Sequence, residues 1–98
     1  MEDGDLQFCW DDDKAASNVE KHGVSFESAT YVFDDPKRLE QLDEFSEGEY
    51  RNIIIGQVDG VLLTVVYSTP EENLYRIISA RQATANERRT YEQNFIHS

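Results

Sequence analysis

The sequence is poor in cysteine and proline and has no long apolar run. Its one cysteine, Cys9, cannot form an internal disulfide, so nothing indicates an exported, disulfide-stabilised protein. The longest apolar run, residues 61–67, has the length of a strand and falls far short of the ~20 residues of a membrane span. The acidic N-terminus lacks the basic and apolar segments of a signal peptide, so we expect a cytoplasmic protein without a membrane partner.

Length and composition fit one folded domain. The 98 residues are 39% hydrophobic and 11% aromatic, which is enough for one core and excludes a disordered chain. Two prolines and five glycines exclude collagen-like and low-complexity chains. We therefore expect a single domain over residues 1–98, with residues 1–5 as a loose tail.

The net charge of −11 is unevenly distributed. Residues 1–50 hold fifteen acids and four bases, whereas residues 51–98 hold five acids and five arginines. An acidic protein is a poor non-specific binder of nucleic acid, because attraction to phosphate is the main sequence-independent contribution to affinity. A local cluster of the arginines could still bind phosphate. The acidic half could suit a basic protein partner, or it could only form a solvated surface that maintains solubility.

Local signals in the first half predict a short strand and two helices. Asp11 is suited to cap the start of a helix, and Gly23 is suited to the position just past its end. Ser25 is a second helix cap, and Pro36 ends the helix that follows it. We expect, in order, a strand over 6–10, a helix over 12–22, a helix over 26–33, a weak edge strand over 38–42 and a loop over 44–48.

The second half predicts three strands and a final helix. Asp59-Gly60 fits a two-residue hairpin turn, and Thr84 with Glu87 forms a capping box. The expected elements are strands over 52–58 and 61–67, a turn region over 68–73, a strand over 74–81 and a helix over 84–96. This order predicts an α+β fold, with two N-terminal helices and a C-terminal helix packed on one face of an antiparallel meander.

The strand expected over 74–81 carries two arginines. Strict alternation puts Arg81 on one face with Ser79, and Arg76 on the other face. An arginine on a half-buried sheet needs an acceptor, because an unpaired buried charge is costly. Two interpretations stay open, namely a structural salt bridge and a clamp for phosphate or carboxylate.

Two further groups of residues could carry chemistry. Lys21 and His22 either complement a helix C-terminus or supply proton transfer and anion stabilisation. Glu49 and Arg51 lie two apart at a strand start, so they share a face and could pair. We expect no metal and no cofactor, because the sequence has no ligand set with zinc or EF-hand spacing and no glycine-rich phosphate loop.

Motifs over residues 6–92 are specific in their combination and order. The two most specific are Asn-x-x-Lys-His-Gly-Val-Ser-Phe over residues 18–26 and Arg-Ile-Ile-Ser-Ala-Arg over residues 76–81. Others are Phe8-x-Trp10-Asp11, Lys14-Ala15, Val32-Phe33-Asp34-Asp35-Pro36 and Gly48-Glu49-x-Arg51. On these residues the chain resembles the BrnT family, small bacterial toxins of type II toxin–antitoxin pairs.

The resemblance implies a fold similar to that of RelE-type ribonucleases and an endoribonuclease activity that halts translation. It also implies a BrnA-type antitoxin that neutralises the toxin and binds operator DNA as part of the complex. Ser79 could donate a hydrogen bond to a phosphate oxygen, and Glu49 and Arg88 are additional candidates. Carried over by motif, the catalytic positions are Lys21, His22, Arg51, Arg76, Ser79 and Arg81.

The implied reaction needs no metal, because the ribose 2′-hydroxyl attacks the adjacent phosphate. His22, or alternatively Lys21, transfers the proton. Arg51, Arg76 and Arg81 hold the phosphate and stabilise its added charge. Because a net charge of −11 repels RNA, we expect binding to be weak or assisted, and the ribosome is one way to present RNA.

Two other functions are compatible with the sequence. The chain could be a catalytically inactive member of the same family that acts only with its antitoxin in a DNA-binding repressor complex. It could also be a structural or adaptor domain with no role in RNA chemistry. A neighbouring gene with a ribbon-helix-helix pattern and growth arrest on expression would separate these alternatives from an active toxin.

The acidic first half leads to a prediction about the antitoxin. If the antitoxin docks through basic side chains, lowering the ionic strength should speed association, because long-range attraction is less screened. Stopped-flow mixing of toxin and antitoxin at several salt concentrations measures this rate. An association rate that does not respond to salt would argue against docking on the acidic half.

Overall fold

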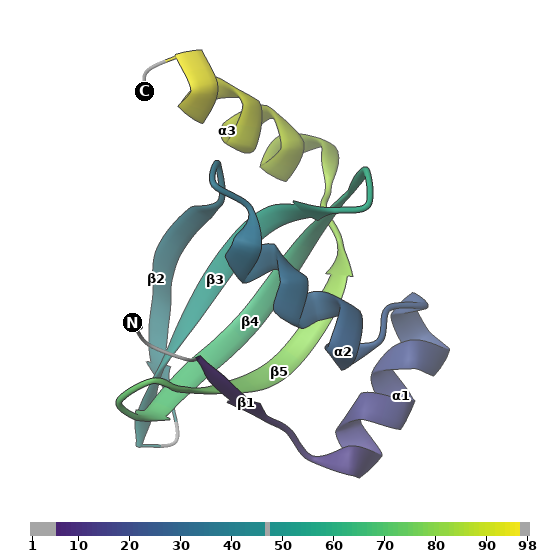
Figure 1. The fold of residues 1–98 in the computed structure, drawn as a ribbon, viewed down its shortest axis with the longest axis vertical. Helices are drawn as coiled ribbons and strands as arrows, with labels where there is room; N and C mark the ends of the chain where they lie inside the picture. Colours follow the sequence, from purple (N-terminus) through teal and green to yellow (C-terminus); the bar gives the residue numbers. More distant parts are fainter. Residues whose placement is uncertain (1–5, 47, 97–98) are drawn as a thin grey trace.

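A computed structural model describes residues 6–46 and 48–96, without the side chains of 42–46, 95 and 96. Figure 1 shows a twisted sheet with short helices around it. No helix in the described part of the chain is long and apolar enough to cross a bilayer. The elements in chain order are β1 (Gln7–Cys9), α1 (Asp12–His22), α2 (Phe26–Ala29), the 3₁₀ helix η1 (Thr30–Asp34), β2 (Leu39–Ser46), β3 (Glu49–Val58), β4 (Val61–Glu71), β5 (Leu74–Gln82) and α3 (Ala85–Ile96).

The predicted helix caps are confirmed. The side chain of Asp11 accepts a hydrogen bond from the Lys14 amide at 3.1 Å, and Gly23 ends α1 with a left-handed φ of 71°. At the start of α3, the Thr84 hydroxyl accepts from the Glu87 amide at 3.2 Å, and the Glu87 carboxylate accepts from the Thr84 amide at 2.9 Å. This reciprocal pair is the expected capping box.

Three predicted boundaries are wrong. The helix expected over 26–33 is α2 followed by η1, since a helix end often tightens into 3₁₀ geometry. The weak strand over 38–42 and most of the loop over 44–48 form one strand, β2, which pairs with β3 despite its polar composition. β4 continues to Glu71 through the region expected to turn. Residues 1–5 and 47 lie outside the described residues.

The sheet has the order β1-β5-β4-β3-β2. β2 to β5 form the predicted antiparallel meander, but β1 joins β5 in parallel, so the sheet is mixed. The expectation of a purely antiparallel sheet is therefore wrong for its first strand. Parallel neighbours need a long connection, and here residues 10–73 separate β1 from β5.

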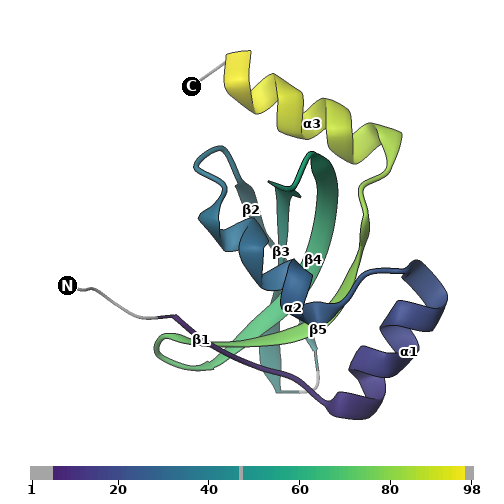
Figure 2. The ribbon, with the colours of Figure 1, turned by 45° about the vertical axis from the view of Figure 1, so that its right-hand side comes forward.

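The main core lies between one face of the sheet and the α2–η1 segment, which crosses that face in Figures 1 and 2. Gly56 in β3 permits this close packing, because a Cβ there would lie 3.0 Å from the carbonyl oxygen of Val32. The fully buried residues of this core include Phe26, Ala29, Val32, Ile54, Val65 and Ala80.

The C-terminal helix does not share this face. Tyr91 of α3 is 3% exposed and packs with Ile55 and Leu62, whose side chains point away from the main core. The Tyr91 hydroxyl also donates to Asp35 at 2.5 Å, at the end of the sheet that α3 crosses (Figures 1 and 2). The expectation that all helices pack on one face is thus wrong for α3, because its buried residue Tyr91 belongs to this second cluster.

A buried asparagine attaches α1 to the sheet. Asn18 is 6% exposed, and its amide donates to the carbonyl oxygens of Ala80 at 2.8 Å and Val24 at 2.9 Å. Its side-chain oxygen accepts from the Ala80 amide at 3.2 Å. The Asn18 side chain therefore forms hydrogen bonds with both the amide and the carbonyl oxygen of Ala80 in β5, as the backbone of a neighbouring strand would.

We predict that Asn18→Ala lowers the free energy of unfolding by about 2–4 kcal/mol, because it leaves three backbone groups without partners. Asn18→Asp should be at least as damaging, since it replaces two donated hydrogen bonds by repulsion between oxygens. Urea unfolding measures both changes. Glu20→Ala, at an exposed position of the same helix, is the control and should change stability by less than about 0.5 kcal/mol. Equal stability of Asn18→Ala and the control would contradict this role.

A charged network holds the start of α3. Arg81 donates two hydrogen bonds to the Glu87 carboxylate, at 2.8 and 2.9 Å, and the buried Thr64 hydroxyl donates a third at 2.9 Å. The Arg81 hydrogen bonds, with help from the Thr84 amide and Thr64, lower the pKa of Glu87 to about 2. The same pairing raises the pKa of Arg81.

This pKa predicts an acid-sensitive contribution to stability. Because the folded-state value of about 2 lies below the ordinary value of 4.5, the contribution of Glu87 is complete above pH 4.5. It is lost as the pH falls from 4.5 towards 2. Glu87→Gln should therefore be less stable than the parent at neutral pH, with a difference that shrinks over that acidic range. Thermal unfolding of both proteins across pH tests this, and a difference independent of pH would refute it.

Candidate functional site

A bulge in β5 sets which side chains share a face. Val66 pairs with Ser79 while Tyr67 pairs with Ile77, so one extra residue is inserted at Ile78. As a result, Ile77 and Ala80 both point into the main core. The predicted separation of the two arginines is therefore wrong. The face away from α2 and η1 carries Arg76, Ser79 and Arg81 together.

Arg51 and Arg76 lie in one row across this open face. Ser68 of β4 pairs with Arg51 of β3 on one side and with Arg76 of β5 on the other, and Cys9 of β1 pairs with Arg76. Strand spacing places the two arginine Cα atoms about 10 Å apart. Both side chains are long enough to contact one ligand across that distance. Ser68 is fully buried between them, and its hydroxyl has no hydrogen-bond partner in the described part of the chain.

The two arginines line a cavity of ≈ 460 Å³ between the open face and the start of α1. A smaller cavity of ≈ 190 Å³ lies along α1 and contains three predicted residues, Lys21, His22 and Ser79. The cavities share Lys14 and Ile78, so we treat them together as the basic groove. Its residues are Cys9, Trp10, Asp11, Lys14, Ser17, Asn18, Lys21, His22, Glu49, Arg51, Arg76, Ile78 and Ser79.

The charge of this groove is opposite to that of the protein. Among the side chains that the structure describes, four of the nine lysines and arginines line it, but only two of the fourteen acids do. The groove therefore attracts anions although the chain as a whole repels them. Lys21 and His22 reach it from the last turn of α1, where both are exposed and also complement the helix dipole.

One acid of the groove, Glu49, pairs with Arg76 at 3.2 Å. The two side chains are 29% and 44% exposed, and an ion pair at such a position contributes about 0–1 kcal/mol. A phosphate that makes a bidentate contact with the guanidinium can therefore displace the carboxylate at little cost.

Arg81 is the one predicted residue outside the groove. Its two hydrogen bonds to Glu87 and their link to Thr64 hold it at the base of α3. Arg88 is exposed on α3 and does not line either cavity. The structure thus brings together five of the six predicted residues, with Glu49 beside them, and places Arg81 in a structural network.

Three residues of this region were not expected from the sequence. Lys14 and Trp10 belong to motifs already noted, but nothing in their spacing indicated that they line a cavity with Arg51 and Arg76. Ser68 could not be placed, because its segment was expected to be a turn. Within the described residues, no group of three or more His, Cys, Asp or Glu side chains is arranged to hold a metal ion.

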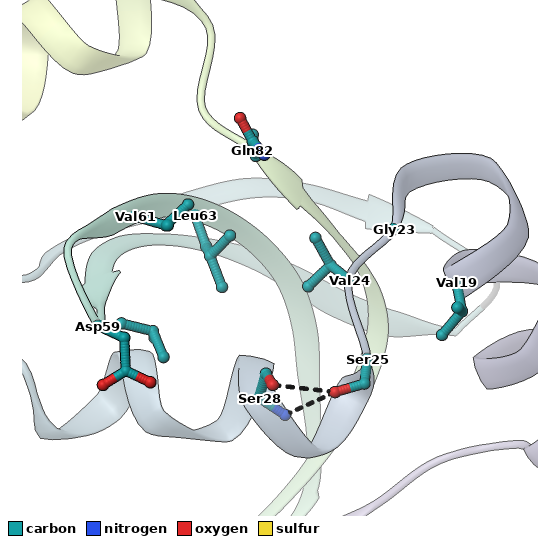
Figure 3. Close-up of a pocket in the computed structure, with 10 residues that line it drawn as sticks. Val19, Gly23, Val24, Ser25, Ser28, Asp59, Val61, Leu63 and Gln82 are labelled. Atoms are coloured by element: carbon teal, nitrogen blue, oxygen red, sulfur yellow. Dashed lines mark hydrogen bonds between the residues drawn. The ribbon is translucent and has the colours of Figure 1, made fainter.

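A different cavity of ≈ 410 Å³ lies between the α1–α2 turn and the β3–β4 hairpin (Figure 3). Its walls are mainly apolar, from Val19 and Val24 on one side and Val61 and Leu63 on the other. Asp59 is the one charged residue among those that line it. The absence of a cation from these walls makes this cavity unsuited to phosphate.

Comparison with known proteins shows the family and the fold of the chain. The family model described as "Ribonuclease toxin, BrnT, of type II toxin-antitoxin system" matches residues 10–87. The crystal structure of the Brucella abortus ribonuclease toxin BrnT superposes with a TM-score of 0.61 at 20% identity, covering 82% of this chain and 99% of that chain. No curated protein sequence matches the chain.

The structural likeness establishes a shared α+β fold, and the family model covers most of the sequence, including every residue that lines the basic groove except Cys9. The chain therefore belongs to the BrnT family of ribonuclease toxins of type II toxin–antitoxin systems.

Proposed function

We propose that the chain is a metal-independent endoribonuclease whose basic groove binds and cleaves RNA and so inhibits translation. The observation that carries the proposal is the concentration of cations in this groove of a protein with a net charge of −11. The two cavities that form the groove hold Arg51, Arg76, Lys14 and Lys21, so the cations gather where a phosphate can bind several of them. The same proposal includes a fold related to that of RelE-type ribonucleases. It also includes the action of residues 1–98 as one toxin domain.

In this mechanism Arg51 and Arg76 hold the scissile phosphate from two sides. The 2′-oxygen forms a bond to phosphorus, and the bond from phosphorus to the 5′-oxygen of the next nucleotide breaks. The phosphate gains negative charge in the transition state, and the two guanidinium groups offset it. Arg76 leaves Glu49 as the phosphate enters, which the weak exposed ion pair permits.

Proton transfer falls to the end of α1. His22 accepts the proton of the 2′-hydroxyl or donates one to the leaving 5′-oxygen, with Lys21 as the alternative. Ser79, in the same small cavity, donates a hydrogen bond to a phosphate oxygen. Products of this route carry a 2′,3′-cyclic phosphate and a 5′-hydroxyl.

Arg81 has a supporting part in the proposal. Its bidentate contact with Glu87 keeps it beside α3. We therefore propose that Arg81 stabilises the attachment of α3 and does not itself contact the phosphate. The family description implies an antitoxin partner. We propose a BrnA-type antitoxin, contact with operator DNA only through that antitoxin, action in the cytoplasm, and RNA presented free or on the ribosome.

The central test is the cleavage of a defined RNA by the purified chain, without antitoxin and in EDTA, with analysis of the fragment termini. We expect 2′,3′-cyclic phosphate ends. Arg51→Ala/Arg76→Ala should cut at least about 100-fold more slowly, because removal of one transition-state donor commonly costs that much. The matched control, Arg38→Ala/Arg89→Ala, removes the same charge outside the groove and should cleave like the parent.

Two results would overturn the assignment. Equal loss of cleavage in both double variants would mean that net charge, and not the groove, determines activity. Absence of cleavage by the parent, on free RNA and on ribosomes and without growth arrest on expression, would favour a catalytically inactive toxin that acts only in a repressor complex.

A further inference from the structure

Trp10 is the one tryptophan of the chain and lies between β1 and α1. It lines the same cavity as Arg51 and Arg76. Its ring stands edge to face with the ring of Phe26, with centroids 5.9 Å apart and an interplanar angle of 76°. Phe26 is completely buried, whereas Trp10 packs against the same core and is only partly buried, so part of Trp10 stays accessible beside the cavity that it lines.

The backbone on both sides fixes the position of this indole. Cys9, the preceding residue, pairs with Arg76 in the parallel register of β1 and β5. Asp11, the following residue, caps α1 through its bond to the Lys14 amide. Trp10 thus directly follows the strand that pairs with Arg76, and both residues line one cavity.

A rigid aromatic side chain beside a phosphate clamp is the usual arrangement for holding an unstacked base. Single-stranded RNA is bound by stacking of its bases on aromatic rings while cationic groups follow the backbone. The cavity volume of ≈ 460 Å³ is in the range of small-ligand sites.

We propose that Trp10 is the stacking surface for a nucleobase of the RNA strand, next to the phosphate held by Arg51 and Arg76. The inference rests on the proposed function, since it names the part of the RNA that the groove recognises beyond its phosphate. It makes Trp10 a substrate-binding residue that positions the strand for attack.

The single tryptophan allows a direct test on the full chain. A 2′-O-methyl dinucleotide monophosphate has a base and a phosphate but no attacking hydroxyl, so it binds without being cleaved. Its titration should quench the tryptophan fluorescence saturably, whereas ribose 5-phosphate, which lacks a base, should quench it little. Equal quenching by both compounds, or none by the dinucleotide, would overturn the proposal.

Variants supply a second measurement by calorimetry with the same dinucleotide. Trp10→Phe keeps an aromatic face and should bind within about threefold of the parent, whereas Trp10→Leu should bind about tenfold more weakly. Circular dichroism shows whether Trp10→Leu is folded, and the fluorescence test on the parent does not depend on that variant. Binding by Trp10→Leu as tight as that of the parent would also refute a stacking role.

The outcomes separate this inference from the proposed function. Base-dependent quenching without any RNA cleavage would refute catalysis and leave the base site in place. Cleavage by the parent, combined with equal quenching by both probes, would refute the base site and leave catalysis in place.

Discussion

The hydrogen bonds between the Asn18 side chain and the Ala80 backbone are the constraint on which the rest of the site depends. β1 covers only the first three residues of β5, so the remaining edge of that strand needs another partner. Asn18 supplies it, and its third bond, to Val24, also fixes the chain as it leaves α1. The helix is held against the sheet by directional polar contacts, which fix its position along the strand more strictly than apolar packing does. Lys21 and His22 therefore stand at a defined place beside the open face.

The second determinant is the single inserted residue in β5. Without it, Arg76 and Arg81 would point to opposite sides of the sheet, and Ala80 would leave the core. With it, one face is apolar against α2 and η1, and the other carries the polar row through Arg51 and Ser68. A bulge costs some strand pairing, which is consistent with its occurrence next to functional side chains. The same insertion brings Ser79 to the wall of the small cavity.

Much of the fold followed from local sequence signals, because helix caps and the Asp59-Gly60 hairpin depend on residues close in sequence. The parts that could not be predicted depend on distant partners. β2 is polar, and it becomes a strand only because β3 offers it a free edge. The Ile78 bulge has no local signal, since periodicity assumes an unbroken alternation. The site residues were named from motifs of the family, while their grouping, and the diversion of Arg81 to Glu87, became visible only in three dimensions.

The pairing of Glu49 with Arg76 has a consequence for the resting protein. The carboxylate acts as an internal counter-ion that occupies the guanidinium until a stronger anion arrives. The apparent affinity of such a site is the intrinsic affinity multiplied by the fraction of molecules in which the arginine is available. For a pair that contributes about 1 kcal/mol, the affinity falls about fivefold. The factor is the same for every anion that needs this guanidinium, so the pair lowers affinity without choosing between ligands. A polymer that also contacts neighbouring groups still binds tightly after this loss, whereas a free phosphate, which has fewer contacts, is held weakly.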